Sequence, residues 1–265
     1  MFRRKSRENK NWLWGPVKRD GTRIDESALV LNLFPRNEIE DAKKVMVDVG
    51  AHFGSSLREF ARRGWKVIAF EPDTDNRERL ETVLEDEWEV VIDSRAVSDH
   101  SESGLPFYRS EVSTGISGLS AFHESHRFSQ PVDVVALQEA LEEYGVAHVD
   151  FLKIDTEGHD LKVLQGYPWQ TDLPTVIVSE FEDNKLEPGS ATNQAEFLHR
   201  LGYCLFISEW HPIIRYGISH DFRGIWKFEL GDEVSTENWG NIIAVQPNMV
   251  KDIEKATLPA IINIS

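Results

Sequence analysis

The sequence predicts an α/β fold: a Rossmann-like, seven-stranded, mostly parallel sheet with helices on both faces. From Val45 onward, short apolar runs alternate with segments of helical periodicity. Parallel strands bring their carboxyl ends to one edge of a sheet, where such folds bind ligands. Five of the predicted strands end in an acid, and these acids outline a polar crevice: Asp48, Glu71, Asp93, Asp155 and Glu180.

The first strand, turn and helix lie in "VMVDVGAHFGSSLREFA", which begins at Val45. The apolar run ends in a turn where Gly50 and Gly54 allow a ligand to approach the backbone closely. A helix with an apolar stripe follows and ends at Gly64. The next strand, "VIAF", leads directly into Glu71.

The later elements continue this alternation. A helix is predicted over 76–85, followed by the strand "EVVID", and then two short strands, "LPFYR" and "PVDVV", flank the loop "STGISGLS". We expect that loop to close over a ligand. Helices over 137–144, 160–165 and 194–201 then alternate with the strands "VDFLKID", "TVIVSE", "YCLFIS" and "NIIAVQ".

Three segments are predicted: an N-terminal cap or extension at 1–44, the α/β domain at 45–248 with a C-terminal lid segment, and a C-terminal tail at 249–265. A chain of 265 residues, 40% hydrophobic, can bury one large core. The single cysteine, Cys204, and the lack of an apolar run of membrane-spanning length make the cytoplasm the expected location. The oligomeric state does not follow from these features.

The net charge of −16 argues against nucleic acid or an anionic membrane as a partner, because both require a cationic surface. A neutral or mildly polar small molecule or glycan is the expected acceptor.

The glycine turn also narrows the choice of cofactor. A dinucleotide fingerprint needs glycine at three places, which here hold Gly50, His52 and Ser55. Glu71, about 20 residues later, suits a ribose. A ligand with a ribose and adenine but no pyrophosphate fits better, and S-adenosylmethionine is the common one.

Four segments, "VDVGAHFG", "FEPD", "SRAVSD" and "FLKIDTEGHDLKVLQG", resemble in this order the FkbM family of S-adenosylmethionine-dependent methyltransferases. The resemblance covers roughly residues 45–182. It implies a seven-stranded Rossmann-like fold. It also implies O-methylation of a sugar hydroxyl, a glycan or a polyketide-type natural product.

The resemblance assigns the cofactor residues. It places Asp48, Gly50, Ala51, His52 and Gly54 beside the methionine end of the cofactor. Glu71 matches the ribose ligand, and Pro72 follows on the same loop. Arg95 and Ala96 match the segment that flanks the adenine, where Arg95 replaces an Asn common in the family and can stack on a purine. Core packing is the alternative role for Ala96.

Methyl transfer to oxygen requires in-line geometry and removal of a hydroxyl proton. Asp155, Glu157 and His159 follow the fourth strand within five residues, and His159 is the natural base at neutral pH. Asp155 is expected to bind the cofactor's amino group or the acceptor. Alternatively, Asp155 with Glu180 or Glu182 holds Mg²⁺, as in catechol-type methyltransferases.

The acceptor residues are expected in the segment 208–228, where aromatic and polar side chains occur together: His211, Arg215, Tyr216 and His220. An aromatic minicore is the alternative interpretation of this segment. Two further classes of function stay open, a cofactor-binding protein without transfer activity and a module of a glycan-building assembly.

Overall fold

The computed structural model describes residues 10–112, 115, 117–121, 123–182, 190–215, 218–235 and 237–262. The chain forms two compact units. Residues 34–177 make one unit, called here the parallel unit, and residues 1–33 with 178–265 make the other, called the antiparallel unit. The division falls within strand β10 (Val176–Glu182).

The parallel unit contains a sheet whose strands run in the order β9-β3-β4-β5. Their bounds are β3 (Val45–Val49), β4 (Lys66–Phe70), β5 (Val90–Asp93) and β9 (Phe151–Ile154). Every pair is parallel. Val47, Ile68 and Leu152 are fully buried, as expected for strands covered on both faces.

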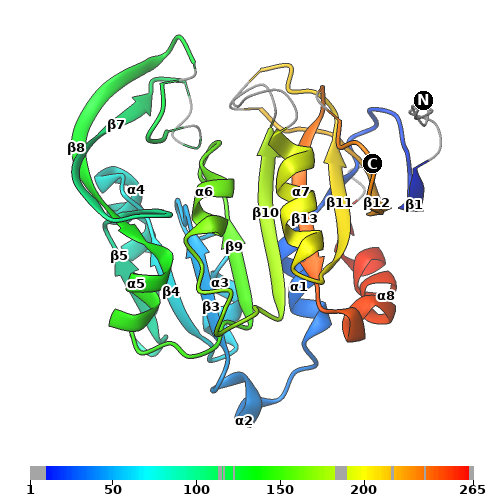
Figure 1. Ribbon diagram of the computed structural model, residues 1–265, viewed down its shortest axis with the longest axis horizontal. Coiled ribbons are helices and arrows are strands. Elements are labelled where there is room, and N and C mark those ends of the chain that lie inside the picture. Colours follow the sequence, from blue (N-terminus) through cyan, green and yellow to red (C-terminus); the bar gives the residue numbers. More distant parts are fainter. Residues whose placement is uncertain are drawn as a thin grey trace. The chain divides into compact units, whose positions relative to one another are not determined.

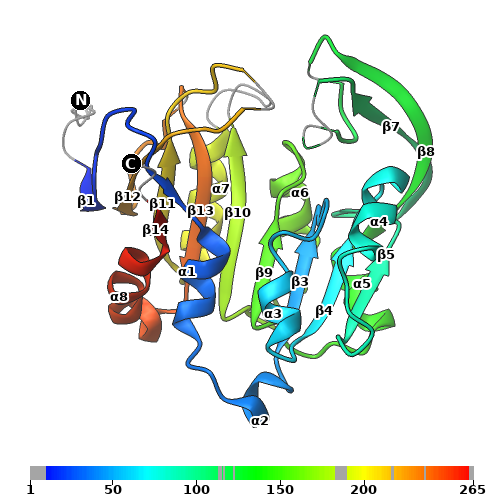
Figure 2. The ribbon, with the colours of Figure 1, turned by 180° about the vertical axis from the view of Figure 1, so that it is seen from behind.

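Helices cover both faces of these strands, with α5 and α6 on one face and α3 on the other (Figures 1 and 2). The helices of this unit are α2 (Glu38–Asp41), α3 (Arg58–Arg62), α4 (Thr74–Glu81), α5 (Leu137–Glu143) and α6 (Asp160–Gln165). Two of them begin at a side-chain cap. Asn37 accepts backbone N–H bonds at α2, and Asp73 does so at α4.

A second, three-stranded sheet belongs to the same unit, in the order β6-β8-β7. It comprises β6 (Ala96–Ser98), β7 (Glu102–Ser110) and β8 (His126–Ala136). The antiparallel pair β7 and β8 forms a hairpin that is longer than the two short strands predicted. Its small apolar core includes Phe107, Val132 and Val134. On the connection between these strands, Gly118 forms a bridge with Tyr108.

The antiparallel unit has the strand order β1-β12-β11-β13-β10. The bounds are β1 (Asn11–Trp14), β11 (Cys204–Trp210), β12 (Phe222–Phe228) and β13 (Trp239–Val245). A two-stranded sheet pairs β2 (Arg23–Ile24) with β14 (Ile261–Ile262). Its helices are α1 (Glu26–Leu33), α7 (Ser190–Arg200), the short η2 (Pro247–Met249) and α8 (Val250–Ala260).

The N-terminal strand is tied to this unit by a buried ion-pair network. Glu209 on β11 is fully buried, and Lys10 donates to it over 2.5 Å. Arg223 and Trp226 on β12 also donate to the Glu209 carboxylate. Residues 11–14, which lie in the segment predicted as a cap, form the edge strand β1 beside β12.

The predicted α/β fold class is confirmed, but the count of seven strands is wrong. All seven predicted sheet strands are present, as β3, β4, β5, β9, β10, β11 and β13. With β10 counted once, the described main-sheet strands of the two units number nine, because β12 pairs with β11 and β1 pairs with β12. Among the described helices, none combines the length and apolar character that crossing a bilayer requires.

Candidate cofactor and active site

The turn after β3 is built on glycines with positive φ, 83° at Gly50 and 77° at Gly54. A Cβ atom on Gly50 would lie 1.9 Å from the carbonyl oxygen of Asp155, and one on Gly54 would lie 2.4 Å from Leu80 Cδ1. The N–H groups of Gly50 and Ala51 donate to the carbonyl of Phe70 over 2.9 and 3.0 Å. Gly50 therefore lets the turn pack tightly against the ends of β4 and β9, and Gly54 lets it pack against α4.

His52 adopts the left-handed conformation without being a glycine, with a φ of 49°. Such conformations cluster at ligand-binding sites, where the surrounding structure holds them in place. The backbone N–H of His52 donates to Glu71 Oε2 over 2.7 Å, and its ring stacks on Phe53. Burial lowers the pKa of His52.

Glu71, at the end of β4, is 4% exposed and is held by neutral donors. Besides His52, the backbone N–H of Asp73 donates to its Oε1 over 2.9 Å, and Asn76 Nδ2 donates over 3.4 Å. Burial raises the pKa of Glu71 to about 7, against the opposing effect of these hydrogen bonds. A buried carboxyl group therefore lies where the sequence predicts the ribose ligand.

The hairpin of β7 and β8 is anchored to the loop that carries Glu71. Arg109 on β7 makes two hydrogen bonds of 2.7 Å to Asp73 and a third of 2.7 Å to Asp75. Gln130 on β8 donates to the carbonyl of Pro72 over 3.0 Å. Two side chains far along the chain therefore fix the Pro72 loop, and neither was singled out from the sequence.

Asp48, at the fourth position of β3, is fully buried and accepts a hydrogen bond from Ser56 on its Oδ2. Its Oδ1 is buried and has no hydrogen-bond partner within the described ranges. Lys153 on β9 lies 3.9 Å from that oxygen and donates to Asp155 Oδ2 over 3.0 Å. Burial raises the pKa of Asp48, and the ammonium of Lys153 acts in the opposite direction.

Arg95 of the predicted adenine segment is hydrogen-bonded to other side chains of the protein. Arg95 hydrogen-bonds both carboxylate oxygens of Asp93, and its Nη2 lies 2.6 Å from Glu143. Tyr144 also donates to Asp93, over 2.9 Å. These hydrogen bonds lower the pKa of Asp93, although burial opposes the shift. Ala96 is 7% exposed and packs in the small core of the β7–β8 hairpin, as the core-packing alternative expects.

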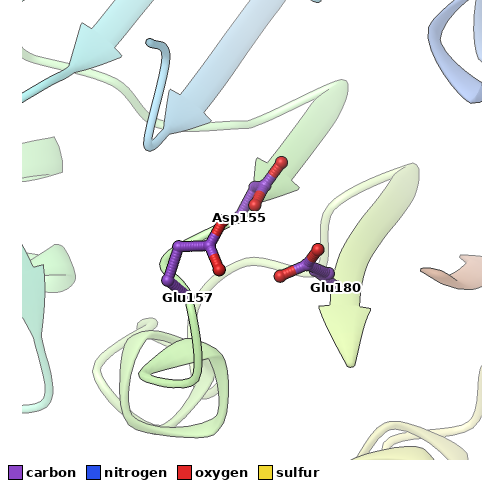
Figure 3. A group of neighbouring side chains, drawn as sticks. All are labelled: Asp155, Glu157 and Glu180. Atoms are coloured by element: carbon purple, nitrogen blue, oxygen red, sulfur yellow. The ribbon is translucent and has the colours of Figure 1, made fainter. Parts of the chain in front are cut away.

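The three predicted catalytic residues follow β9 on the segment that leads to α6. Figure 3 shows Asp155 at the strand end and Glu157 on the following loop, and one carboxylate oxygen of each lies within 4.8 Å of the other. Glu157 has a left-handed φ of 57°. Glu180, also labelled in Figure 3, and Glu182 are buried acids of β10 and lie in the antiparallel unit.

His159 precedes α6, and its Nε2 is 2.9 Å from the hydroxyl of Ser98 on β6. Ser98 donates to Asp99, which also pairs with Lys162 over 2.9 Å. Burial lowers the pKa of His159 below its ordinary value of 6.5. The ring is therefore neutral at physiological pH, with one nitrogen already hydrogen-bonded.

The predicted acceptor residues belong to the antiparallel unit. His211 Nε2 is 3.0 Å from the carbonyl of Val17, and the ring of His220 packs edge-on against Trp239. Arg215 is exposed, and Tyr216 lies outside the described residues. The aromatic contacts of this segment, such as Trp210 stacked on Trp239, match the minicore that the sequence left open as an alternative.

The residues at the carboxyl ends of β3 and β4 fit S-adenosylmethionine. Asp48 Oδ1 and Asn76 Oδ1 are buried acceptors that have no donor within the described parts of the chain. Glu71 is a second buried acid at the same edge of the sheet. Hydroxyl and ammonium donors satisfy such acceptors, whereas a pyrophosphate would add negative charge beside them. The donor groups of a ribose and an amino acid are therefore the right chemistry for this edge.

A family model, the methyltransferase FkbM domain, matches residues 48–205. Among similar solved structures, precorrin-6y C5,15-methyltransferase from Geobacter metallireducens is 14% identical, with 79% of this chain and 85% of that chain covered and a TM-score of 0.41. A proposed methyltransferase from Streptococcus mutans in complex with SAH is 9% identical, with 77% and 96% covered and a TM-score of 0.42. An rRNA methylase from Streptococcus thermophilus is 9% identical, with 77% and 95% covered and a TM-score of 0.39. The chain has no significant match among curated proteins.

Proposed function

The chain belongs to the methyltransferase FkbM domain family, and we propose that this S-adenosylmethionine-dependent methyltransferase acts on a hydroxyl oxygen of a sugar, glycan or polyketide-type product. The observation that carries the proposal is the order of four family segments in the sequence, three of which place acids at the ends of the adjacent parallel strands β3, β4 and β9. The net charge of −16 supports an uncharged acceptor over a polyanion.

When bound, S-adenosylmethionine supplies an electrophilic methyl group. The chain must then orient the acceptor and take up its hydroxyl proton. We assign His159 as the base that accepts this proton. It is neutral at pH 7 because burial lowers its pKa. Its Nε2 is engaged with Ser98, so Nδ1 is the atom that receives the proton. Asp155 is assigned to the amino group of the cofactor or to the acceptor.

The acceptor is tested first by a methyl-transfer screen. Purified protein is incubated with radiolabelled S-adenosylmethionine and panels of monosaccharides, oligosaccharides, polyketide alcohols, carbon nucleophiles and RNA. A product that carries the label in an O-methyl ether supports the proposal. Label found on carbon, or on RNA alone, contradicts it. Cofactor binding without transfer to any panel would favour the non-catalytic alternative.

The role of His159 is tested on the acceptor found in that screen. Replacing His159 by Ala should slow the reaction by about 10²- to 10⁴-fold, as loss of a general base does. Activity of the parent should persist at pH 6.5 and fall only at lower pH, because burial lowers the pKa of His159 and the base is protonated only below that lowered pKa. His148, exposed and paired with Asp172 over 2.7 Å, provides the matched histidine control. Equal rates for His159→Ala and His148→Ala would remove His159 from the mechanism.

The metal-dependent route predicts a different response. In that route Asp155, with Glu180 or Glu182, holds Mg²⁺ and the ion acidifies the acceptor hydroxyl. Exhaustive EDTA treatment should leave activity intact in the His159 route. The metal route is supported if EDTA abolishes activity, Mg²⁺ restores it and His159→Ala stays fully active. In that case the metal and not His159 activates the acceptor hydroxyl.

A further inference from the structure

Lys153 is a charged residue in the interior of a buried parallel strand. Its neighbours along β9, Leu152 and Ile154, are fully buried, and its own side chain is 15% exposed. Placing an ammonium in such surroundings is unfavourable unless partners compensate for the lost hydration. The position therefore requires an explanation in terms of its partners.

The partners of Lys153 include two of the acids predicted to bind the cofactor. β3 and β9 are parallel and in a register that places Lys153 directly opposite Asp48. Its Nζ lies 3.9 Å from Asp48 Oδ1 and donates to Asp155 Oδ2 over 3.0 Å. One cation thus lies next to two carboxylates, and the charge of the three groups together is −1.

This set of charges is incomplete without a further donor. Asp48 Oδ1 is buried and accepts no hydrogen bond within the described ranges, and Lys153 is too far from it for a hydrogen bond. A ligand ammonium would supply that bond and offset one negative charge of the surrounding carboxylates. A ligand carboxylate would in turn lie next to the Lys153 ammonium. An α-amino acid carries both groups on one carbon atom.

We propose that Lys153 is a cofactor-positioning residue, whose ammonium between Asp48 and Asp155 forms with them a receptor for the amino-acid end of S-adenosylmethionine. This inference rests on the proposed function, because it takes S-adenosylmethionine as the ligand of this edge. The competing explanation is that Lys153 only offsets the charge of buried Asp48 and thereby maintains the fold.

Two ligands separate these explanations. S-adenosylhomocysteine (SAH) contains the adenine, the ribose, the sulfur and the amino acid, whereas 5′-methylthioadenosine lacks the amino acid. The parent protein should bind SAH roughly 10- to 100-fold more tightly than 5′-methylthioadenosine, because the amino acid adds charge-assisted hydrogen bonds. In Lys153→Met, SAH binding should weaken by about tenfold or more, while binding of 5′-methylthioadenosine stays nearly unchanged.

The control is Lys44→Met. Lys44 is 20% exposed and lies 3.9 Å from Asp150, so its burial and its ion-pair distance match those of Lys153. It precedes β3, at the end of the strand opposite the glycine turn. Calorimetric titration of both ligands into the control should give the parent's ratio of affinities.

Each outcome decides between the explanations. Equal weakening of both ligands in Lys153→Met, or no weakening of either, overturns the inference while the proposed function stands. If Lys153→Met, Lys153→Gln and Lys153→Arg all fail to fold by circular dichroism, Lys153 is a fold residue and the inference is also overturned. If the parent binds neither ligand, the proposed function itself has failed.

Discussion

Glu71 is the residue whose surroundings have the most direct consequence for ligand binding. Its buried carboxyl has a pKa of about 7, and it must be ionised to accept two ribose hydroxyls. The affinity for SAH should therefore fall as pH decreases through 7. Titration calorimetry from pH 5.5 to 8.5 measures this dependence. In Glu71→Gln the affinity should be lower at pH 8 and nearly independent of pH, and a parent-like pH profile in this variant would contradict the assignment.

The Glu71 carboxyl group also makes the free energy of unfolding depend on pH. Because burial raises the pKa of folded Glu71 above its ordinary value of 4.5, its favourable contribution is complete below pH 4.5 and is lost as pH rises to about 7. Glu71→Gln mimics the protonated form. The variant should therefore be more stable than the parent at pH 8, by on the order of 3 kcal/mol, and similar to it near pH 4.5. Urea denaturation at the two pH values checks this, and a difference independent of pH would refute it.

The positions of site residues in the fold were predictable where local spacing carries the information. Asp48 lies near the end of β3 and Glu71 directly follows β4, as the apolar runs predicted, and their roles in cofactor binding stay predictions. The pairing of Arg95 with Glu143 joins residues far apart in the chain, so no local pattern reveals it. Lys153 was recognisable, because a lysine interrupts the apolar run "FLKI". That signal was not used in the sequence analysis.

At the scale of elements, the β7–β8 hairpin is fixed to the Pro72 loop through Arg109. Its guanidinium makes a bidentate pair with Asp73, a fully buried acid that also caps α4. Replacing Arg109 by Met leaves that carboxylate without its cation. We expect a loss of about 1 to 3 kcal/mol in the free energy of unfolding, measured with urea.

Arg127 is the matched control for this prediction. It lies on the same hairpin, but it is 62% exposed and 3.8 Å from Glu111, which is itself exposed. Pairs of this kind contribute little to stability. Arg127→Met should unfold like the parent. If both variants lose stability equally, the contact between Arg109 and Asp73 is not what anchors the hairpin.

The order of elements was predictable, whereas their edges and lengths were not. Alternating apolar runs and helical stripes report local structure, and every strand predicted for the main sheet is present. The pairing of β1 with β12 joins residues 11–14 to residues 225–227, and only tertiary contacts reveal such a pairing. The hairpin was predicted too short because exposed polar residues, such as those in "HRFSQ", obscure the first half of β8.

At the scale of the whole molecule, a bound cofactor should stabilise the protein by mass action. SAH at one hundred times its dissociation constant should add about 2.7 kcal/mol to the free energy of unfolding. NAD at the same concentration should add nothing. Thermal unfolding with each ligand checks both expectations, and equal shifts of the melting temperature would mean that the glycine turn accepts a pyrophosphate.

The central claim is that the acids at the ends of β3, β4 and β9 form a site for S-adenosylmethionine. The most direct test is a titration calorimetry experiment at pH 8, in which SAH and NAD are added in turn to the purified chain. We expect saturable binding of one SAH per chain and no detectable binding of NAD. Tight binding of NAD with no binding of SAH would contradict it.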